Sequence, residues 1–416
     1  MEYRGTAPGL DDLLLDAVTI IELSDHDREV ADNRYRRLKP HLERPSSPLR
    51  ELLLNNTCLI YAQGSMAIGA TIVSGTDDDR FDVDALIDVA VPEHWSNDEA
   101  LDQLYDALQG FPDVQKIVRC TRCVQLQFAF MHMDVTILDP AADPRPERVG
   151  EIFHSPDTGT SYRVPSNPYG FSQWFRKNVT YPSQQFLEAA QARRRSFSVD
   201  RLPTMIAMDK AEQENLPPVV PPRIDAQQVH ALKLMKRYLN IRFERRGLRR
   251  PPSIYLTKLS VTCGYESLGL TAQLERFAAK IKMEMEAALI ANNGPDERNP
   301  SYEPDRLNDR WPTTQAERKM LADDMVVLLK ALEKAREIEI KDVVAIFSDL
   351  FGERVSKRTI DAFSKQLDQR STPKTRHFER GTGAIIPATA LATPAVARSA
   401  SEVPRHNFHC EDDSEG

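Results

Sequence analysis

The chain has 416 residues, of which 41% are hydrophobic, and a formal net charge of −8. This length allows two or three domains with buried cores, and the acidic balance argues against a general nucleic-acid-binding protein. Five scattered cysteines are too few for a disulfide scaffold. Because we find neither a signal peptide nor an apolar run that could span a bilayer, we expect a cytoplasmic protein.

The first third of the chain predicts helices followed by a sheet. Residues 11–43 have helical spacing, and Ser24 or Asp25 can restart the helix. Alternating apolar residues from Cys58 to Leu138 predict the strands of a small sheet.

Three carboxylates fall on two of these predicted strands. Side chains alternate between faces along the segment Phe81 to Val89, so Asp82 and Asp84 share one face. The same alternation places Asp134 on the polar face of the segment Met131 to Leu138. If the polar faces align, three carboxylates meet, and such hard oxygen ligands suit Mg²⁺ or Mn²⁺.

A Gly-Ser step precedes the carboxylates. In Gln63-Gly64-Ser65, Gly64 allows close backbone approach, and the amide and hydroxyl of Ser65 can bind phosphate oxygens. An Asp-x-Asp pattern alone is common by chance in an acidic protein, and a second acidic run, Asp77 to Asp79, reads as a solvated loop. The combination of the Gly-Ser step with acidic residues on two strands predicts metal-dependent transfer of a nucleotidyl group.

Cys120 and Cys123 have the C-x-x-C spacing of many zinc ligands. They lie in Lys116 to Phe130, which predicts a single strand. Residues three apart on one strand face opposite sides, so we interpret both as structural cysteines and expect no structural zinc.

The second half of the chain predicts a helical region. Asp225 can cap a helix that runs to about Arg246. Lys236 falls within the apolar stripe of this helix, where a buried ammonium group needs an anion such as phosphate or carboxylate. Alternatively, the stem of Lys236 packs on the stripe while its head reaches water. Ser253, which opens the next segment after two prolines, can bind phosphate or cap a helix.

Helical signals continue to about residue 366. Thr314 and Glu317 predict a capping box for a helix that runs to about Lys334. The basic clusters at 193–195 and 245–250 read as solvated faces. We predict a catalytic core with an N-terminal helix at residues 1–180, followed by an excursion rich in Pro, Arg and Gln at 181–224. A helical lobe at 225–366 and a flexible, disordered tail at 367–416 complete the predicted organisation.

These residues resemble the bacterial CD-NTases, relatives of the animal cyclic GMP-AMP synthase and of oligoadenylate synthase. The resemblance covers roughly residues 10–360. It is carried by Gln63-Gly64-Ser65, Asp82-Val83-Asp84, Met131 to Val135, Asn167-Pro168 through Trp174-Phe175, Leu234-Met235-Lys236, Pro252-Ser253-Ile254, Asn299-Pro300 to Asp309-Arg310-Trp311, and Leu350 to Arg354.

The resemblance implies an α+β, two-lobed nucleotidyltransferase fold of the polymerase β type, with a small mixed sheet and a helical lobe. It implies that two Mg²⁺ or Mn²⁺ ions are bound by Asp82, Asp84 and Asp134, with Asp134 nearest the attacking ribose hydroxyl. It also assigns nucleotide binding to a set of five residues. These are Gln63, Gly64, Ser65, Lys236 and Ser253.

The resemblance further implies that ATP, GTP or pyrimidine nucleotides are joined into a cyclic di- or trinucleotide that activates an effector in anti-phage defence. Some family members are ligated to targets by a ubiquitin-transfer-like (E1/E2-like) enzyme, so the C-terminal Gly416 is a candidate for conjugation. The zinc-binding cluster of the animal DNA sensor has no counterpart here, so direct binding of duplex DNA is not implied. Tyr169 and Phe171 are candidates for stacking on a base.

Two other functions remain open at this stage. The same site could transfer nucleotides in linear fashion to an RNA end or a protein side chain. The chain could also be a non-catalytic nucleotide-binding scaffold that acts through its tail, although the presence of all three carboxylates disfavours this reading.

Overall fold

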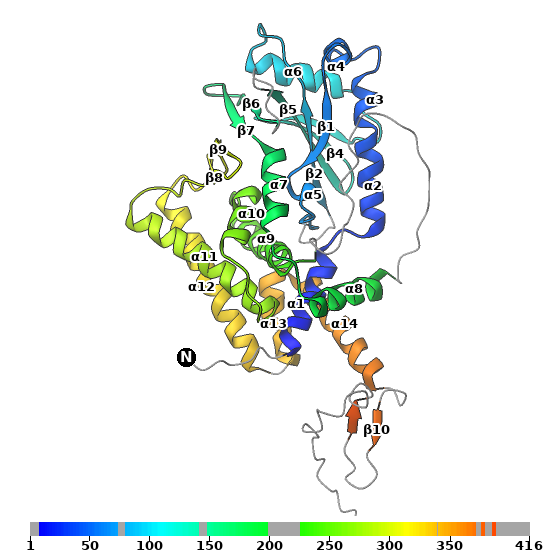
Figure 1. Cartoon of the computed structure of the whole chain (residues 1–416), viewed down its shortest axis with the longest axis vertical. Coiled ribbons are helices and arrows are strands. Elements are labelled where there is room, and N and C mark those ends of the chain that lie inside the picture. Colours follow the sequence, from blue (N-terminus) through cyan, green and yellow to red (C-terminus); the bar gives the residue numbers. More distant parts are fainter. Residues whose placement is uncertain are drawn as a thin grey trace, which may run out of the picture. The chain divides into compact units, whose positions relative to one another are not determined.

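A computed structural model of the chain, shown in Figure 1, describes residues 8–73, 80–140, 148–198, 225–338, 340–371, 376–378 and 385–387. Residues up to Thr359 form one compact unit, and those from Ile360 onward belong to a second. The acidic run Asp77 to Asp79, the segment 199–224 of the predicted excursion and Gly416 lie outside the described residues.

The first unit contains a mixed sheet whose strands follow the order β1-β2-β5-β4-β3, with β6 paired to β5 and β7 paired to β6. β2 and β5 run parallel, and the other pairs are antiparallel. The strands are β1 (Leu59–Gln63), β2 (Phe81–Asp88), β3 (Lys116–Arg119), β4 (Val124–Gln127), β5 (Met131–Pro140), β6 (Gly150–His154) and β7 (Tyr162–Ser166). This arrangement confirms the predicted mixed sheet and α+β class.

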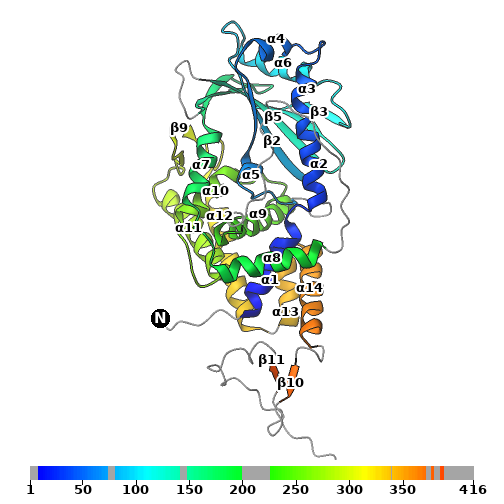
Figure 2. The same ribbon diagram turned by 45° about the vertical axis from the view of Figure 1, so that its right-hand side comes forward.

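One face of the sheet packs against an apolar core. The side chains of Phe81, Val83 and Ala85 on β2 are fully buried, as are Met133 and Val135 on β5. Helices α2, α3, α4 and α6 supply the residues packed on this face, and Figures 1 and 2 show α2 and α6 beside the strands. The strict alternation along β2 therefore directs Asp82 and Asp84 to the opposite face.

The helices of the first half of the chain agree with the predicted helical stretch in 11–43. Ser24 caps α2 and forms a capping box with Asp27, which confirms the predicted restart. The helices in this half are α1 (Pro8–Ile21), α2 (Asp25–Arg36), α3 (Leu38–Leu42), α4 (Arg50–Asn55), α5 (Gly64–Ala67), α6 (Asn97–Leu108), α7 (Pro168–Asn178) and α8 (Gln184–Ser198).

Between residues 225 and 371, the described part of the chain contains helices and one short hairpin. Thr314 and Glu317 form the predicted capping box at the start of α12. The elements are α9 (Gln227–Arg246), α10 (Ser253–Thr262), α11 (Leu270–Ile290), β8 (Arg298–Asn299), β9 (Tyr302–Arg306), α12 (Gln315–Glu337), α13 (Ile340–Phe351) and α14 (Glu353–Ser371). In the second unit, β10 (Arg376–Phe378) pairs antiparallel with β11 (Ile385–Pro387). No described helix combines the length and apolar character needed to cross a membrane.

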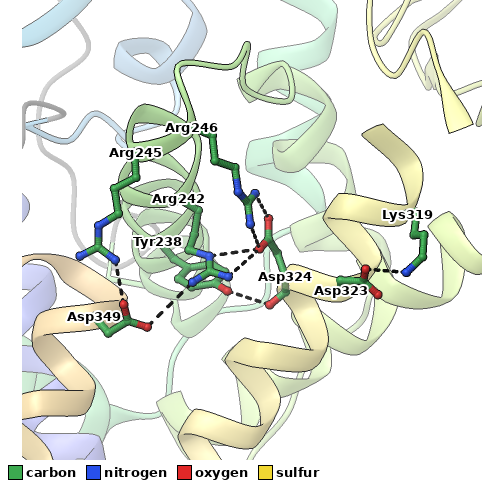
Figure 3. Close-up of polar contacts among 8 residues, drawn as sticks. All are labelled: Tyr238, Arg242, Arg245, Arg246, Lys319, Asp323, Asp324 and Asp349. Carbon is green, nitrogen blue, oxygen red and sulfur yellow. Dashed lines mark hydrogen bonds and ion pairs between the residues drawn. The ribbon is translucent and has the colours of Figure 1, made fainter. Parts of the chain in front are cut away.

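The C-terminal end of α9 is fixed by ion pairs to two other helices (Figure 3). Asp324 of α12 is almost fully buried and accepts hydrogen bonds from Arg246 at 2.7 Å and from Arg242 at 3.1 Å. Arg245 pairs with Asp349 of α13 at 2.7 Å. Residues 245–250 are exposed, as the prediction of a solvated face requires. Arg245 and Arg246 nevertheless also pair with carboxylates of other helices, and the buried Asp324 needs such cationic partners.

A second ionic cluster joins α1, α8 and α9. Glu22 binds the ammonium group of Lys233 at 2.6 Å and the guanidinium group of Arg194 at 2.7 and 2.9 Å. Arg194 also pairs with Asp225, which is fully buried. Asp225 is therefore not the cap of α9, whose N-cap residue is Ala226, and the basic run at 193–195 is not a solvated face.

His230 lies within this cluster, and its burial predicts that the free energy of unfolding depends on pH. Its side chain is buried, and burial together with the charge of Lys233 lowers its pKa from 6.5 to about 3. Between about pH 3 and pH 6.5 the unfolded chain binds a proton at His230, whereas the folded chain does not. The free energy of unfolding is therefore highest above pH 6.5 and decreases as the pH falls toward 3.

Replacing His230 with glutamine should therefore flatten the acid side of the stability curve. From pH 7 to pH 4.5 the wild-type chain should lose about 2 kcal/mol more than His230→Gln, measured by urea unfolding at both pH values. His26→Gln, at an exposed position on α2, is the matched control. Equal losses in the wild-type chain and His230→Gln would contradict the expectation.

Candidate active site

The predicted carboxylates lie in one row of the sheet. Asp84 of β2 is in register with Gln63 of β1 and with Asp134 of β5, and Asp134 is in register with Gln125 of β4. Residues in register on paired strands point to the same face. Asp82 precedes this row on the same face and is in register with His132. The three aspartates thus share the polar face of the sheet.

The Gly-Ser step lies against this row. Gly64 begins α5 in the left-handed region, with φ of +61°. A Cβ atom at this position would lie 2.1 Å from the Oδ2 atom of Asp84, so only glycine allows the turn to approach the carboxylate this closely. Ser65 follows, and its hydroxyl accepts a hydrogen bond from Lys236 Nζ at 2.7 Å.

Lys236 lies on α9, so the helical region contributes a side chain to the site. Its ammonium group also donates to the carbonyl of Ala70 at 2.9 Å. Burial lowers the pKa of Lys236 from 10.5 to about 8, although the charges of Asp84 and Asp82 oppose the change. The ammonium group of Lys236 therefore contacts the Ser65 hydroxyl and the Ala70 carbonyl, and its binding of phosphate stays a prediction.

The carboxylates repel one another in the absence of a cation. Burial, with the charges of Asp134 and Asp82, raises the pKa of Asp84 from 3.8 to about 8. The pKa of Asp134 is also raised by burial, although a hydrogen bond from Gln125 Nε2 to its Oδ1 atom, 2.8 Å long, works against this. His132 Nδ1 lies 3.6 Å from Asp82 Oδ1. As the side chains stand, no three His, Cys, Asp or Glu residues in the described ranges are arranged to hold a metal ion.

These groups open into one cleft of about 340 Å³. Six of its lining residues were predicted from the sequence as site residues, namely Ser65, Asp82, Asp84, Asp134, Lys236 and Ser253, and the others were missed. The lining residues are Ser65, Thr71, Ile72, Asp82, Asp84, Asp134, Lys236, Leu239, Asn240, Arg249, Arg250, Pro251, Ser253 and Leu256. Ser253 is the first residue of α10, whose N-cap residue is Pro252, and it lines the cleft, where its hydroxyl can reach a ligand.

Other candidates lie elsewhere. Gln63 ends β1 but is outside the lining of the cleft. Tyr169 packs edge-on against Tyr61, with ring centroids 6.0 Å apart. Phe171 is buried beside Trp174. Neither Tyr169 nor Phe171 lines the cleft, so the idea that they stack on a base finds no support, and for the buried Phe171 it is wrong.

The cysteine pair requires a correction. Residues 116–130 form two strands rather than one, because the chain reverses between Arg119 and Val124. The Cys120 amide donates to the Cys123 carbonyl at 2.8 Å, so the two cysteines oppose each other across a hairpin and lie on the same face. The argument that they point to opposite faces was wrong.

No protein-family model matches the sequence. The chain is 30% identical over 405 residues to the cyclic dinucleotide synthase CdnG of Bradyrhizobium diazoefficiens, and the alignment covers 95% of this chain and 92% of that protein. The chain belongs to the CD-NTase family. The structure of Bradyrhizobium diazoefficiens CD-NTase CdnG in complex with GTP matches with a TM-score of 0.72 at 31% identity, covering 86% of this chain and 99% of that one.

More distant CD-NTase structures share the fold alone. Vibrio cholerae DncV cyclic AMP-GMP synthase with a linear intermediate has 13% identity and a TM-score of 0.53, over 82% of this chain and 94% of that one. CdnC of E. coli MS115-1, in its complex with HORMA-deltaN, has 15% identity and a TM-score of 0.52, over 82% and 96%. The predicted family and fold are confirmed, and so is the prediction of a nucleotidyltransferase of the cyclic-oligonucleotide synthase class.

Proposed function

We propose that this CD-NTase uses the cleft to join nucleoside triphosphates into a cyclic dinucleotide or trinucleotide that activates an effector in anti-phage defence. The observation that carries the proposal is the register of β2 and β5, which places Asp84 beside Asp134, with Asp82 on the same face, opposite Lys236 and Ser65. The GTP bound to Bradyrhizobium diazoefficiens CdnG makes GTP a candidate substrate, together with ATP.

The donor triphosphate would bind at the end of the cleft formed by Ser65, Lys236 and Ser253. Lys236 supplies a buried positive charge that can form charge-assisted hydrogen bonds with phosphate oxygens. Because Gly64 has no Cβ atom, the turn approaches Asp84 closely, and the backbone amide of Ser65 can then reach the same phosphates. Arg250 and its hydrogen-bond partner Asn240 also line the cleft.

The three carboxylates of the site are oxygen ligands of the kind that divalent cations prefer. Asp82, Asp84 and Asp134 would hold two Mg²⁺ or Mn²⁺ ions, because three mutually repelling carboxylates with a raised pKa at Asp84 favour cation binding. When bound, such ions would neutralise the triphosphate and stabilise the charge that develops on the attacking and leaving oxygens.

We infer that Asp134 receives the proton of the acceptor hydroxyl. The amide of Gln125 occupies its Oδ1 atom, so the Oδ2 atom is left to accept the proton. The ribose oxygen then forms a bond to the α-phosphorus of the donor, and the bond to the β-phosphate breaks with its electron pair leaving on pyrophosphate. A later transfer of the same kind within the linear product closes the ring.

The test is to incubate the purified chain with labelled nucleoside triphosphates and Mg²⁺ or Mn²⁺, and to identify the products by mass. A cyclic product has no terminal phosphate and should survive phosphatase, and chelation of the metal should stop its formation. A product that phosphatase shortens would favour linear transfer instead. If no nucleotide is consumed under any of these conditions, the catalytic assignment is contradicted.

A further inference from the structure

Two cysteines oppose each other at the tip of the hairpin formed by β3 and β4. The register of the strands pairs Arg119 with Val124, and the next step toward the turn brings Cys120 opposite Cys123. The Cys120 amide donates to the Cys123 carbonyl at 2.8 Å. Directly opposed residues of antiparallel strands have Cα atoms about 4.5 or 5.5 Å apart, and both separations suit a disulfide bond.

Both thiols of this pair can be reached from solvent, because each side chain is only partly buried. A side-chain hydrogen bond from Cys123 lowers the pKa of the Cys120 thiol from 9.0 to about 7. Burial instead raises the pKa of Cys58 and that of Cys263 to about 11. The thiolate is the nucleophile in thiol–disulfide exchange. Cys120 is therefore the most reactive of the cysteines that the structure describes.

Other parts of the chain hold the two residues between the cysteines. The Thr121 carbonyl accepts a hydrogen bond from the Ser155 amide at 2.9 Å. Arg122 donates from Nε to the Nδ1 atom of His154 at 2.9 Å and pairs with Asp309. The turn is thus anchored, so a change in the distance between the cysteines would be taken up by the strands that follow them.

The strand β4 connects the cysteine pair to the carboxylates of the cleft. Gln125 lies two residues after Cys123 and is in register with Asp134 of β5. Its Nε2 atom donates to Asp134 Oδ1 at 2.8 Å, and its Oε1 atom accepts from Gln127 Nε2 at 2.7 Å. The orientation of the Asp134 carboxylate therefore depends on the position of β4 close to the cysteines.

A disulfide bond would shorten the distance between the strands at the hairpin tip. Directly opposed Cβ atoms lie about 4.5–5.5 Å apart, whereas those of a disulfide bond lie about 3.8 Å apart. The bond would therefore draw the strands together by about 1 Å, and Gln125 would shift relative to Asp134. A displacement of about 1 Å in an active site can lower a rate by up to about a hundredfold.

We propose that Cys120 and Cys123 form a reversible intrachain disulfide bond, and that this bond slows nucleotide transfer by displacing Gln125 from Asp134. The oxidant is a low-molecular-weight disulfide such as oxidised glutathione. Formation of the bond is independent of the proposed function, whereas its effect on the rate rests on that function.

The reaction proceeds in two exchange steps. The Cys120 thiolate attacks one sulfur of the reagent, whose S–S bond breaks, and the first thiol leaves with the electron pair and takes up a proton. Cys123 then loses its proton and attacks the Cys120 sulfur, which forms the intrachain bond and releases the second thiol. Two cysteine thiols are oxidised, and one reagent disulfide is reduced to two thiols.

Peptide mapping tests the bond itself. The full-length reduced chain is incubated with mixtures of reduced and oxidised glutathione, and the remaining thiols are then blocked. Trypsin cleaves after Arg119 and Arg122 and so separates Cys120 from Cys123, which leaves a disulfide bond as the link between their two peptides. The linked peptides should appear as oxidised glutathione increases and disappear on reduction. Their absence, or a bond from either residue to a different cysteine instead, would overturn the proposal.

The rate of product formation tests the consequence. The oxidised wild-type chain should transfer nucleotides about tenfold or more slowly than the reduced chain, and reduction should restore the rate. Cys120→Ser leaves Cys123, whose thiol pKa is raised, so the rate of this variant should change less than about twofold on the same treatment. Cys58→Ser is the matched control and should respond like the wild-type chain.

Linked peptides with an unchanged rate would overturn the proposed effect on transfer. So would an equal loss of rate in Cys120→Ser and the wild-type chain. The wild-type comparison before and after reduction needs no variant, and thermal unfolding shows whether Cys120→Ser is folded. If the reduced wild-type chain forms no product, the proposed function fails, while the peptide map still decides whether the disulfide bond forms.

Discussion

Replacing Asp84 with asparagine is expected to lower the rate of nucleotide transfer by about a thousandfold or more, and to leave the fold intact. Asparagine keeps the shape of the side chain but cannot carry the negative charge that a divalent cation needs. Asp84 lies between Gly64 and the register partner Asp134, so no nearby carboxylate can take its position. The neutral amide also relieves repulsion from Asp82 and Asp134.

The measurement is product formation with Mg²⁺ or Mn²⁺, together with thermal unfolding in the presence of a chelator. The unfolding temperature of Asp84→Asn should equal or exceed that of the wild-type chain, because repulsion is removed. Asp88→Asn is a matched control, since Asp88 ends the same strand, β2, but lies outside the lining of the cleft. Turnover by Asp84→Asn comparable to that of Asp88→Asn would remove Asp84 from the proposed metal site.

The carboxylates could be found from sequence because the evidence for them is local. Alternation along β2 and β5 fixes which side chains share a face, and Asp82, Asp84 and Asp134 break an otherwise apolar pattern. Only the pairing of the strands had to be assumed, and the structure shows that Asp84 and Asp134 are direct partners. Lys236 was visible for a similar reason, as a charge within an apolar helical stripe.

The remaining site residues depend on contacts distant in sequence. Gln125 reaches Asp134 only because β4 pairs with β5 in one particular register. The hairpin that sets this register turns at Thr121 and Arg122, without the Gly or Asn that normally marks such a turn. The sequence therefore favours a continuous strand over residues 116–130, and this prediction conceals the pairing of the two cysteines.

The helical half shows the same limit. Asp225 has the residue type of a helix cap, but Arg194 from α8 takes its carboxylate, which local propensity cannot reveal. Arg249 and Arg250 are exposed, as a basic run usually is. Their position on the wall of the cleft follows from the end of α9, which Asp324 and Asp349 fix from other helices.

Replacing Lys236 with methionine is expected to weaken binding of a non-hydrolysable nucleoside triphosphate by about 10- to 100-fold. Methionine is of similar length, so it preserves packing on α9 while removing the ammonium group that faces Ser65 and the carboxylates. The triphosphate would then meet Asp82 and Asp84 with one fewer positive charge. Calorimetric titration with the analogue measures the affinity, and steady-state kinetics should show a raised KM for the donor.

Two variants distinguish direct phosphate binding from a structural role. Ser65→Ala removes the hydroxyl that Lys236 contacts but leaves the charge, so it should cost less than Lys236→Met, about fivefold in affinity. Lys282→Met removes a partly exposed lysine of α11 that pairs with Glu286, and should bind the analogue like the wild-type chain. If Lys236→Met kept full affinity and only lowered the unfolding temperature, its bond to the Ala70 carbonyl would be its main role. The donor triphosphate would then have to be held by other polar residues that line the cleft, such as Ser253 and Arg250.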